Sequence, residues 1–468
     1  MPEPMTASQT FWTPQAWLPG GWARDVRLTV AADGTWQHIE AGIARTPANA
    51  SAATLTCLDS TMLPGVVNAH SHAFQRAIAG LTEHSGGQQD DFWSWRDRMY
   101  RAALRITPAQ LEAIATQLYA ELLQGGYTHV CEFHYLHNHL DGQPYANPLE
   151  MSLALVRAAQ AAGIGLTLLP VLYMHSGFAV QRQGGGLRED QRRFASTPDS
   201  VLRIAEAVNA MALPRVNAGL ALHSLRAIDP AALKEASAAA AQHGWPVHIH
   251  IAEQMQEVDD CLAHHGQRPV EWLLNHAAVD ARWNLVHATH SNPQELAGIK
   301  TTGASVVLCP STEANLGDGV FDLPTHLQLK AAWSIGSDSH VTRHLSEELR
   351  LLEYSQRFAR RQRNVAARAG NADSTAGALF TGALQGGAAA SGLPLGGLVA
   401  GQRADFCLLN TNAPALAGIP AEHLLDAWVF SSPDAACTAH HVGGQAVPVV
   451  KAGWQAGLAQ AMRAMWGT

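Results

Sequence analysis

The chain has 468 residues, of which 47% are hydrophobic and only 15% are charged, and its formal net charge at pH 7 is -8. This composition is typical of a compact globular protein with a large core, and it excludes a disordered or fibrous chain. The negative charge and the lack of a Lys/Arg cluster argue against nucleic acid and anionic membranes as partners. There is no secretory signal and no apolar run of about 18 residues, and the six scattered cysteines favour free thiols, so we expect a cytoplasmic protein.

Both ends of the chain show short alternating runs separated by turn residues, which predict β-strands. Asp33-Gly34 marks a hairpin within residues 26–43. In the tail, the runs starting at 401, 427 and 437 are again predicted as strands, and a terminal helix is expected after Gly453. We therefore expect residues 1–62 and 399–468 to meet in one small β-sandwich domain.

Between them, residues 63–398 alternate short apolar strands with Ala/Leu-rich amphipathic segments such as 107–126 and 153–163. This alternation predicts an α/β fold with a parallel (β/α)8 TIM-like barrel. A polar residue before proline marks helix starts at positions 107, 229 and 292. Eight strands are expected, ending near Asn68, Glu132, Leu172, His223, His250, His287, Pro310 and Asp338.

Three of the predicted strand ends carry side chains that bind metals. His70 and His72 are two residues apart, so both point to the same side of one strand and can hold one ion together. His250 ends a later strand, and Asp338 follows a run whose Gly336 allows close approach of the backbone. Because the active sites of such barrels lie at the carboxyl ends of the strands, these four residues predict one divalent metal site.

Two further groups are expected beside this metal. Glu253 follows His250 by three residues, which places a carboxyl near the ion as a general acid and base. His287 ends the next strand and, like Asp338, can help to remove a proton from water activated by the metal. We predict Glu253, His287 and Asp338 as catalytic residues, with either of the last two taking the proton of water.

The histidine segments PGVVNAHSH (64–72), HIAE (250–253) and GSDS (336–339), together with His287, resemble the amidohydrolase superfamily of metal-dependent barrel hydrolases. The longer matches HAFQRA, FWSWRD and STEANLGDG resemble, within that superfamily, the formimidoylglutamate deiminases of histidine degradation. Binuclear members carry a lysine or glutamate on the fourth strand, where this chain has His223 and neither of these. The resemblance therefore implies a single metal ion.

The resemblance implies hydrolysis of N-formimino-L-glutamate to N-formyl-L-glutamate and ammonia. Such a substrate has two carboxylates, which call for cationic partners. Arg96 lies in the aromatic segment FWSWRD and Arg226 lies three residues past His223, in a loop at the top of the barrel. The aromatic side chains around Arg96 are predicted as core. The resemblance places a set of residues in the substrate pocket: Gln75, Arg96, Tyr135, His223 and Arg226.

Three questions stay open at this point. The same metal site would serve a deaminase of purine, pterin or pyrimidine-like rings, although two arginines argue against it. A barrel without activity, used as a scaffold, is a second alternative, since a fold alone never proves activity. Imidazole and carboxylate ligands suit zinc, our expected metal, but also iron, manganese or cobalt. Since many barrels of this superfamily form dimers, we also expect a homodimer.

Overall fold

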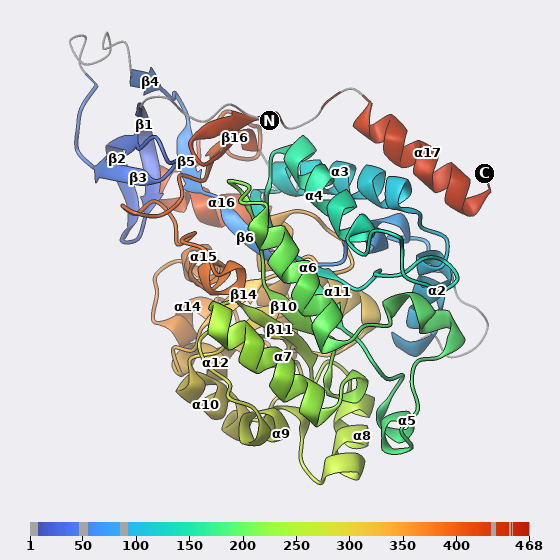
Figure 1. The fold of residues 1–468 in the computed structure, drawn as a ribbon. Helices are drawn as coiled ribbons and strands as arrows, with labels where there is room; N and C mark the ends of the chain where they lie inside the picture. Colours follow the sequence, from blue (N-terminus) through green and yellow to red (C-terminus); the bar gives the residue numbers. More distant parts are fainter. Residues whose placement is uncertain are drawn as a thin grey trace.

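The structure is a computed structural model, and it describes residues 8–45, 55–84, 92–431, 437–448, 451 and 453–467. Figure 1 shows a large body of helices around a central sheet, with the blue N-terminal strands and the red strand β16 side by side at one end. The C-terminal helix α17 (Trp454–Trp466) lies apart from that end, against α3 (Pro108–Gln124).

The central sheet contains the eight predicted parallel strands, in the order β14-β13-β12-β11-β10-β8-β7-β6, with the short β9 (Val216–Ala218) beside β8. The α/β barrel prediction is confirmed, and each observed strand ends within three residues of its predicted end. The eight strands are β6 (Val66–Ser71), β7 (Tyr127–His134), β8 (Gly165–Leu172), β10 (Leu220–Leu222), β11 (Val247–Ile251), β12 (Trp283–His287), β13 (Ser305–Leu308) and β14 (Trp333–Ile335).

The barrel closes where β14 meets β6. Beyond the end of β14, Asp338 forms a parallel bridge with Ser71, and its backbone N–H donates to the carbonyl of His70 at 3.0 Å. Gly336 makes this approach possible, because a Cβ there would lie 2.7 Å from the Cβ of His70. The seam between the first and last strands therefore holds two of the predicted metal ligands next to each other.

Helices surround the barrel and follow the predicted starts. Thr107 and Asn292 cap α3 and α10, where each side-chain oxygen accepts a backbone N–H, and proline occupies the first turn. The other helices are α2 (Phe92–Ala103), α4 (Glu150–Ala162), α5 (Phe178–Arg182), α6 (Pro198–Ala210), α7 (Pro230–His243), α8 (Met255–His265), α9 (Pro269–His276), α10 (Pro293–Thr302), α11 (Pro310–Leu316), α12 (Leu323–Gln328), α13 (Leu345–Arg360), α14 (Val365–Gly370) and α15 (Thr375–Ser391), with 3-10 turns η1 (Ala73–Ala77), η2 (Glu189–Phe194), η3 (Leu225–Ala227) and η4 (Ala421–His423).

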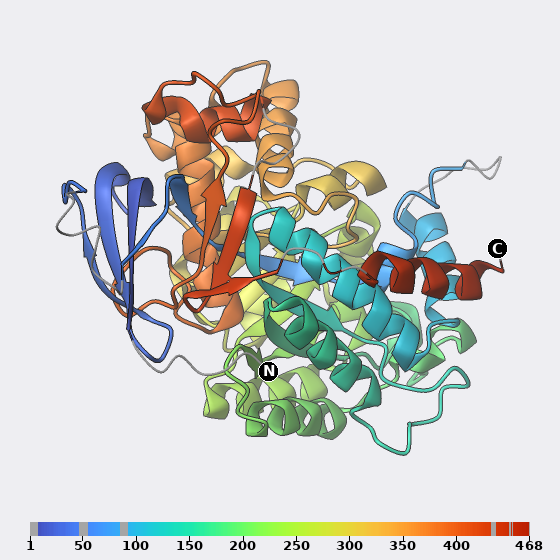
Figure 2. The same ribbon diagram turned by 90° about the horizontal axis from the view of Figure 1, so that it is seen from above.

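Both chain ends share a second sheet, in the order β17-β16-β15-β5-β1-β2-β3, with β4 beside β1 (Figure 2). The predicted hairpin at Gly34 joins β2 to β3, and Trp36 packs against Phe406 of the distant strand β15 at 5.8 Å between ring centroids. The sheet therefore folds over its own small core, and the predicted joining of the two ends is confirmed. Its strands are β1 (Gln9–Leu18), β2 (Gly21–Val30), β3 (Trp36–Glu40), β4 (Leu55–Cys57), β5 (Thr61–Pro64), β15 (Phe406–Leu409), β16 (Cys437–Val442) and β17 (Gln445–Val447).

One predicted strand of the tail is wrong. The run starting at 427 belongs to helix α16 (Leu424–Ser431), whose buried Trp428 packs against Phe380 of α15 at 6.2 Å between ring centroids. Tertiary packing here outweighs the β-preference of the sequence WVF. The predicted terminal helix is confirmed as α17, which begins after Gly453. The domain limits predicted at residues 62 and 398 stay predictions. Among the described residues, no helix is long and apolar enough to span a bilayer.

Candidate active site

Four of the predicted residues converge at the carboxyl end of the barrel. The Nε2 atoms of His70 and His72 are 3.2 Å apart, and the Nε2 of His250 lies 2.9 Å from that of His70. Asp338 Oδ1 lies 3.5 Å and 3.4 Å from the Nε2 atoms of His70 and His72. Imidazole nitrogens this close need a proton or a cation between them, so the arrangement fits a metal site.

The chemistry of these imidazoles also fits a metal ion. The Nδ1 of His72 donates to the carbonyl oxygen of Phe133 at 2.9 Å, which leaves the lone pair of Nε2 free for the site. Burial lowers the pKa of all three histidines, that of His72 to about 3 with a further contribution from His70. Since a neutral imidazole is the form that binds metals, burial prepares His70, His72 and His250 for this role.

The backbone turns sharply where the strands deliver these side chains. His287 and Asp338 have φ values of +68° and +47°, and Ala252, just past β11, has +51°. Such left-handed conformations are uncommon for residues other than glycine and concentrate at functional sites. They aim the side chains at the strand ends toward a common point rather than along the strands.

The three predicted catalytic residues lie together beside the candidate metal ligands. The Nε2 of His287 is 3.6 Å from Glu253 Oε1 and 3.8 Å from Asp338 Oδ2. Burial raises the pKa of Glu253 to about 7, and the negative charge of Asp338 adds to this shift. A carboxyl group with this pKa can hold or release a proton near neutral pH.

The pKa values of the other two groups, His287 and Asp338, shift in opposite directions. Burial lowers the pKa of His287, but the carboxylates of Glu253, Glu313 and Asp338 outweigh it and raise the pKa to about 10. Burial acts to raise the pKa of Asp338, but the facing imidazoles hold it well below its usual value. In the protein without metal, His287 is therefore a cation between carboxylates, and Asp338 is ionised.

A pocket with about 430 Å³ of open space leads from these groups toward the predicted substrate-binding residues. Gln75 donates from Nε2 to the hydroxyl of Tyr135 at 3.0 Å, and the ring of His223 stacks on Tyr173 with centroids 4.0 Å apart. The five predicted residues all line this pocket together with His72, His250, Glu253, His287 and Asp338.

Two arginines, Arg96 and Arg226, line this pocket and form what we call its arginine end. The guanidinium of Arg96 lies over Trp93 at 4.4 Å, and that of Arg226 lies over the same ring at 5.8 Å. Arg96 Nε and Arg226 Nη1 are buried and have no hydrogen-bond partner among the described residues. Because a buried charged donor is costly when unpaired, these atoms point to an anionic ligand.

Several residues of the site were missed from the sequence. The aromatic segment around Arg96, predicted as core, is partly pocket wall: Phe92, Trp95 and Tyr100 line the pocket with Met99. Their spacing on α2 gives no sign of this, because core and pocket rings follow the same helical pattern. Glu313 was also missed, although it lies in the STEANLGDG segment that supported the resemblance; it contacts Nδ1 of His287 at 3.4 Å.

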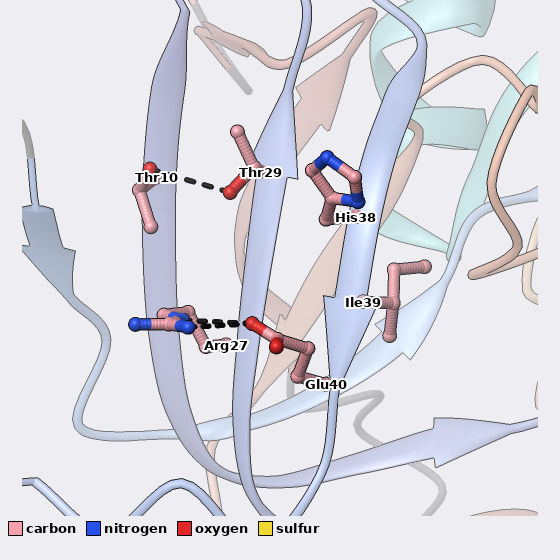
Figure 3. Close-up of a pocket in the computed structure, with 6 residues that line it drawn as sticks. All are labelled: Thr10, Arg27, Thr29, His38, Ile39 and Glu40. Carbon is pink, nitrogen blue, oxygen red and sulfur yellow. Dashed lines mark hydrogen bonds and ion pairs between the residues drawn. The ribbon is translucent and has the colours of Figure 1, made fainter.

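A second hollow lies on the small sheet, away from these groups. Figure 3 shows it along β1 to β3, lined by Thr10, Thr29 and His38, with Arg27 and Glu40 paired at 2.6 Å. Its two charges satisfy each other and are exposed, so this hollow offers no unpaired group for a ligand.

Comparison with known proteins agrees with this site. The model "Amidohydrolase family" matches residues 61–447, and "Formimidoylglutamate deiminase HutF, N-terminal domain" matches residues 10–52. A formimidoylglutamate deiminase of Pseudomonas aeruginosa is 48% identical over 96% of both chains. The chain belongs to the formimidoylglutamate deiminases of the amidohydrolase family.

One further relative and two solved structures are also similar to this chain. An 8-oxoguanine deaminase of Pseudomonas aeruginosa is 28% identical over 68% of this chain and 69% of its own. The solved structure of an amidohydrolase from Brucella melitensis is 41% identical, with a TM-score of 0.89 over 98% of this chain and 99% of its own. An adenosine deaminase from Xanthomonas campestris, 20% identical with a TM-score of 0.79 over both whole chains, shares the fold. This chain thus has the fold of other amidohydrolases, and residues 10–52 also match the formimidoylglutamate deiminase model.

Proposed function

We propose that this chain hydrolyses N-formimino-L-glutamate to N-formyl-L-glutamate and ammonia at a site with one divalent cation. The observation that carries the proposal is one pocket lined by two unlike sets of groups. Imidazoles and Asp338 form one set, and two arginines with unpaired buried donors form the other. A substrate that carries a formimino group and two carboxylates matches both sets at once. The formimidoylglutamate deiminase of Pseudomonas aeruginosa supports the same substrate.

We assign His70, His72, His250 and Asp338 as metal ligands. A cation held there would lower the pKa of water toward about 7 and so supply a nucleophile at neutral pH. Zinc is the ion we propose, because imidazole and carboxylate ligands suit it.

Glu253 and His287 handle protons and charge in this proposal. The oxygen of water bonds to the formimino carbon, and one of its protons passes to a neighbouring carboxylate. Glu253 gives a proton to the departing nitrogen, so that the carbon–nitrogen bond breaks and ammonia leaves, while the second proton of the water is released as the formyl carbonyl forms. A pKa of about 7 suits Glu253 for the transfer to nitrogen. His287, a cation between carboxylates, stabilises the negative charge that develops on oxygen.

The substrate's glutamate part is assigned to the two arginines. Arg96 and Arg226 bind its carboxylates, and stacking on Trp93 holds both guanidinium groups in place. Gln75 and Tyr135, already bonded to each other, and His223 supply neutral hydrogen-bonding groups. A planar ring would leave at least one guanidinium unpaired, which disfavours ring deamination.

Three further proposals concern the setting of the enzyme. A role in histidine degradation follows from the proposed substrate. A cytoplasmic location suits the free cysteines, which include Cys131, Cys261 and Cys309 in the core. We also propose a homodimer, which light scattering of the purified protein tests directly. A monomer at micromolar concentration would contradict the dimer without affecting the proposed reaction.

The deciding experiment measures ammonia release from N-formimino-L-glutamate, 8-oxoguanine and adenosine side by side. We expect turnover of the first alone, loss of activity after chelation, and recovery on adding about one equivalent of zinc. Faster turnover of either ring compound would replace the proposed substrate. Full activity in protein shown to be free of metal would overturn the metal site.

A further inference from the structure

His287 is held at both of its ring nitrogens. Its Nε2 faces Glu253 at 3.6 Å and Asp338 at 3.8 Å, while its Nδ1 contacts Glu313 Oε1 at 3.4 Å. The ring is almost fully buried, with 1% of its surface exposed. No other group is recorded at Nδ1 in the part of the chain that the structure describes, so Glu313 alone receives this N–H.

Glu313 is itself fixed by its surroundings. It lies on α11, and its Oε1 accepts the backbone N–H of Cys309 at 2.9 Å. Its own backbone carbonyl accepts the N–H of Asp318 at 2.9 Å, which ties the end of the short helix to the following loop. Glu313 is 6% exposed, so water cannot readily replace it as an acceptor. A rigid, buried carboxylate therefore stands behind the histidine.

Such a carboxylate restricts the ring of His287. The outer torsion of a histidine side chain has broad, roughly two-fold minima, so a ring without a partner at Nδ1 can turn and exchange its two nitrogens. The backbone of His287 at φ +68° and of Ala288 at φ +49° sets where the side chain enters the site, but it does not set how the ring turns about its outer torsion. An acceptor at Nδ1 makes one orientation, with Nε2 toward Glu253 and Asp338, the preferred one.

We propose that Glu313 is a positioning residue that holds Nδ1 of His287 and so directs Nε2 of that ring at the reacting group. The proposal rests on the proposed function for the identity of the reaction, but not for the orientation of the ring. Among the described residues, no hydrogen bond or ion pair joins Glu313 to His70, His72, His250 or Asp338, and Glu313 does not line the pocket. We therefore expect its effect on turnover to pass through His287.

The test is a double-mutant cycle with Glu313→Met, His287→Asn and the double variant, assayed on N-formimino-L-glutamate. Glu313→Met keeps much of the volume and removes the acceptor, so alone it should lower kcat by about 10- to 100-fold, the usual size for a partner behind a functional histidine, with KM changed less than about three-fold. In the His287→Asn background the same change should alter kcat by less than about three-fold. Equal losses in both backgrounds would show that Glu313 acts independently of His287 and would overturn the proposal.

Two measurements separate positioning from general damage. Bound metal and the inhibition constant of N-formyl-L-glutamate should stay as in the wild type, because neither the imidazole cluster nor the arginines contact Glu313. Glu295→Met is the matched control: Glu295 is also a buried carboxylate that accepts backbone N–H groups, but it pairs with Arg268 at 3.0 Å outside the pocket. It should lower Tm and leave kcat unchanged. Loss of metal in Glu313→Met would assign Glu313 to the metal site instead.

A crystal structure of the Glu313→Ala variant with metal bound tests the orientation of the His287 ring without an activity assay. We expect the His287 ring to turn or to occupy two orientations. An unchanged ring would overturn the positioning role even if the enzyme is active. Conversely, wild-type protein that does not hydrolyse N-formimino-L-glutamate would overturn the proposed function, while the orientation of the ring would still decide the role of Glu313.

Discussion

Strand β11 carries two buried histidines, only two residues apart, whose side chains have different partners. His248, nearer the amino end of the barrel, donates from Nε2 to the backbone carbonyl of Ala390 at 2.8 Å. His250, at the carboxyl end, has its Nε2 at 2.9 Å from the Nε2 of His70, and among the described residues no carbonyl or hydroxyl is recorded at that nitrogen. Burial lowers the pKa of both, so their difference lies in the partner and not in the environment.

The same contrast extends around the barrel. At the amino end, His129 bonds to the hydroxyl of Thr167 at 2.7 Å, and Thr167 donates in turn to Asn217. At the carboxyl end, histidine nitrogens and arginine donors face one another or an open pocket. A polar group with a protein partner stabilises the fold, and a buried polar group without one is available for a ligand.

Replacing each histidine of β11 in turn tests this contrast most strongly. His250→Ala should lose the bound metal and all measurable ammonia release, because a ligand is removed from the cluster. His248→Gln should retain the metal and the turnover, and lose only about 1–3 kcal/mol of unfolding free energy through the weakened bond to Ala390. Metal analysis and thermal unfolding of both variants measure the difference. Metal loss in His248→Gln alone would reverse the assignment.

The next largest effect is expected at Glu253, which lies at the carboxyl end but outside the metal cluster. Glu253→Gln keeps the size of the side chain and removes its proton transfer, so turnover should fall by about 10² or more. Bound metal should stay at the wild-type level, in contrast to His250→Ala. Steady-state kinetics together with metal analysis test this role of Glu253. Unchanged turnover would show that Glu253 takes no part in the reaction.

The barrel and most of the candidate site could be predicted from the sequence, because the side chains of the site lie at the ends of the strands. The alternation of strands and helices predicts the barrel, and side chains at the carboxyl ends of neighbouring strands must meet at one face. The choice of His250 over His248 follows from the same rule and agrees with the observed cluster. Gly336 was expected to allow close approach, and a Cβ there would press on His70.

The features that the sequence did not predict depend on contacts between residues far apart in the chain, and local sequence patterns do not report such contacts. Glu313 reaches His287 from the following βα unit, and the distance between these side chains is set by how α11 packs after β13. Tyr100 lines the pocket while Tyr119 on α3 is core, although both lie on amphipathic helices with similar spacing. The helix α16 replaced a predicted strand because packing of Trp428 outweighed its neighbours' β-preference.

The arginine end of the pocket should respond in KM rather than in the chemistry. Arg226→Met keeps much of the volume and removes the charge, so we expect KM for N-formimino-L-glutamate to rise by about 10- to 100-fold with a smaller change in kcat. Arg403→Met is the control at the opposite end of the barrel, where Arg403 pairs with Asp405 at 2.6 Å. It should lower Tm and leave KM unchanged. A KM that responds equally to both variants would mean that the charge of Arg226 does not bind substrate.

The smallest effect concerns the pH dependence of stability at the amino end. Burial, aided by the positive charge of Arg403, holds the pKa of His129 well below its ordinary value of 6.5. The unfolded chain therefore binds a proton at His129 below about pH 6.5 while the folded protein does not, so stability falls as the pH drops below that value. This one group contributes a slope of at most about 1.4 kcal/mol per pH unit. His129→Gln should show a shallower loss of unfolding free energy between pH 6.5 and 5 than the wild type, and His38→Gln, at an exposed position of the small sheet, should match the wild type. Identical slopes for His129→Gln and the wild type would show that His129 is protonated in the folded state, and His129 would then differ in charge from the neutral imidazoles of the candidate metal site.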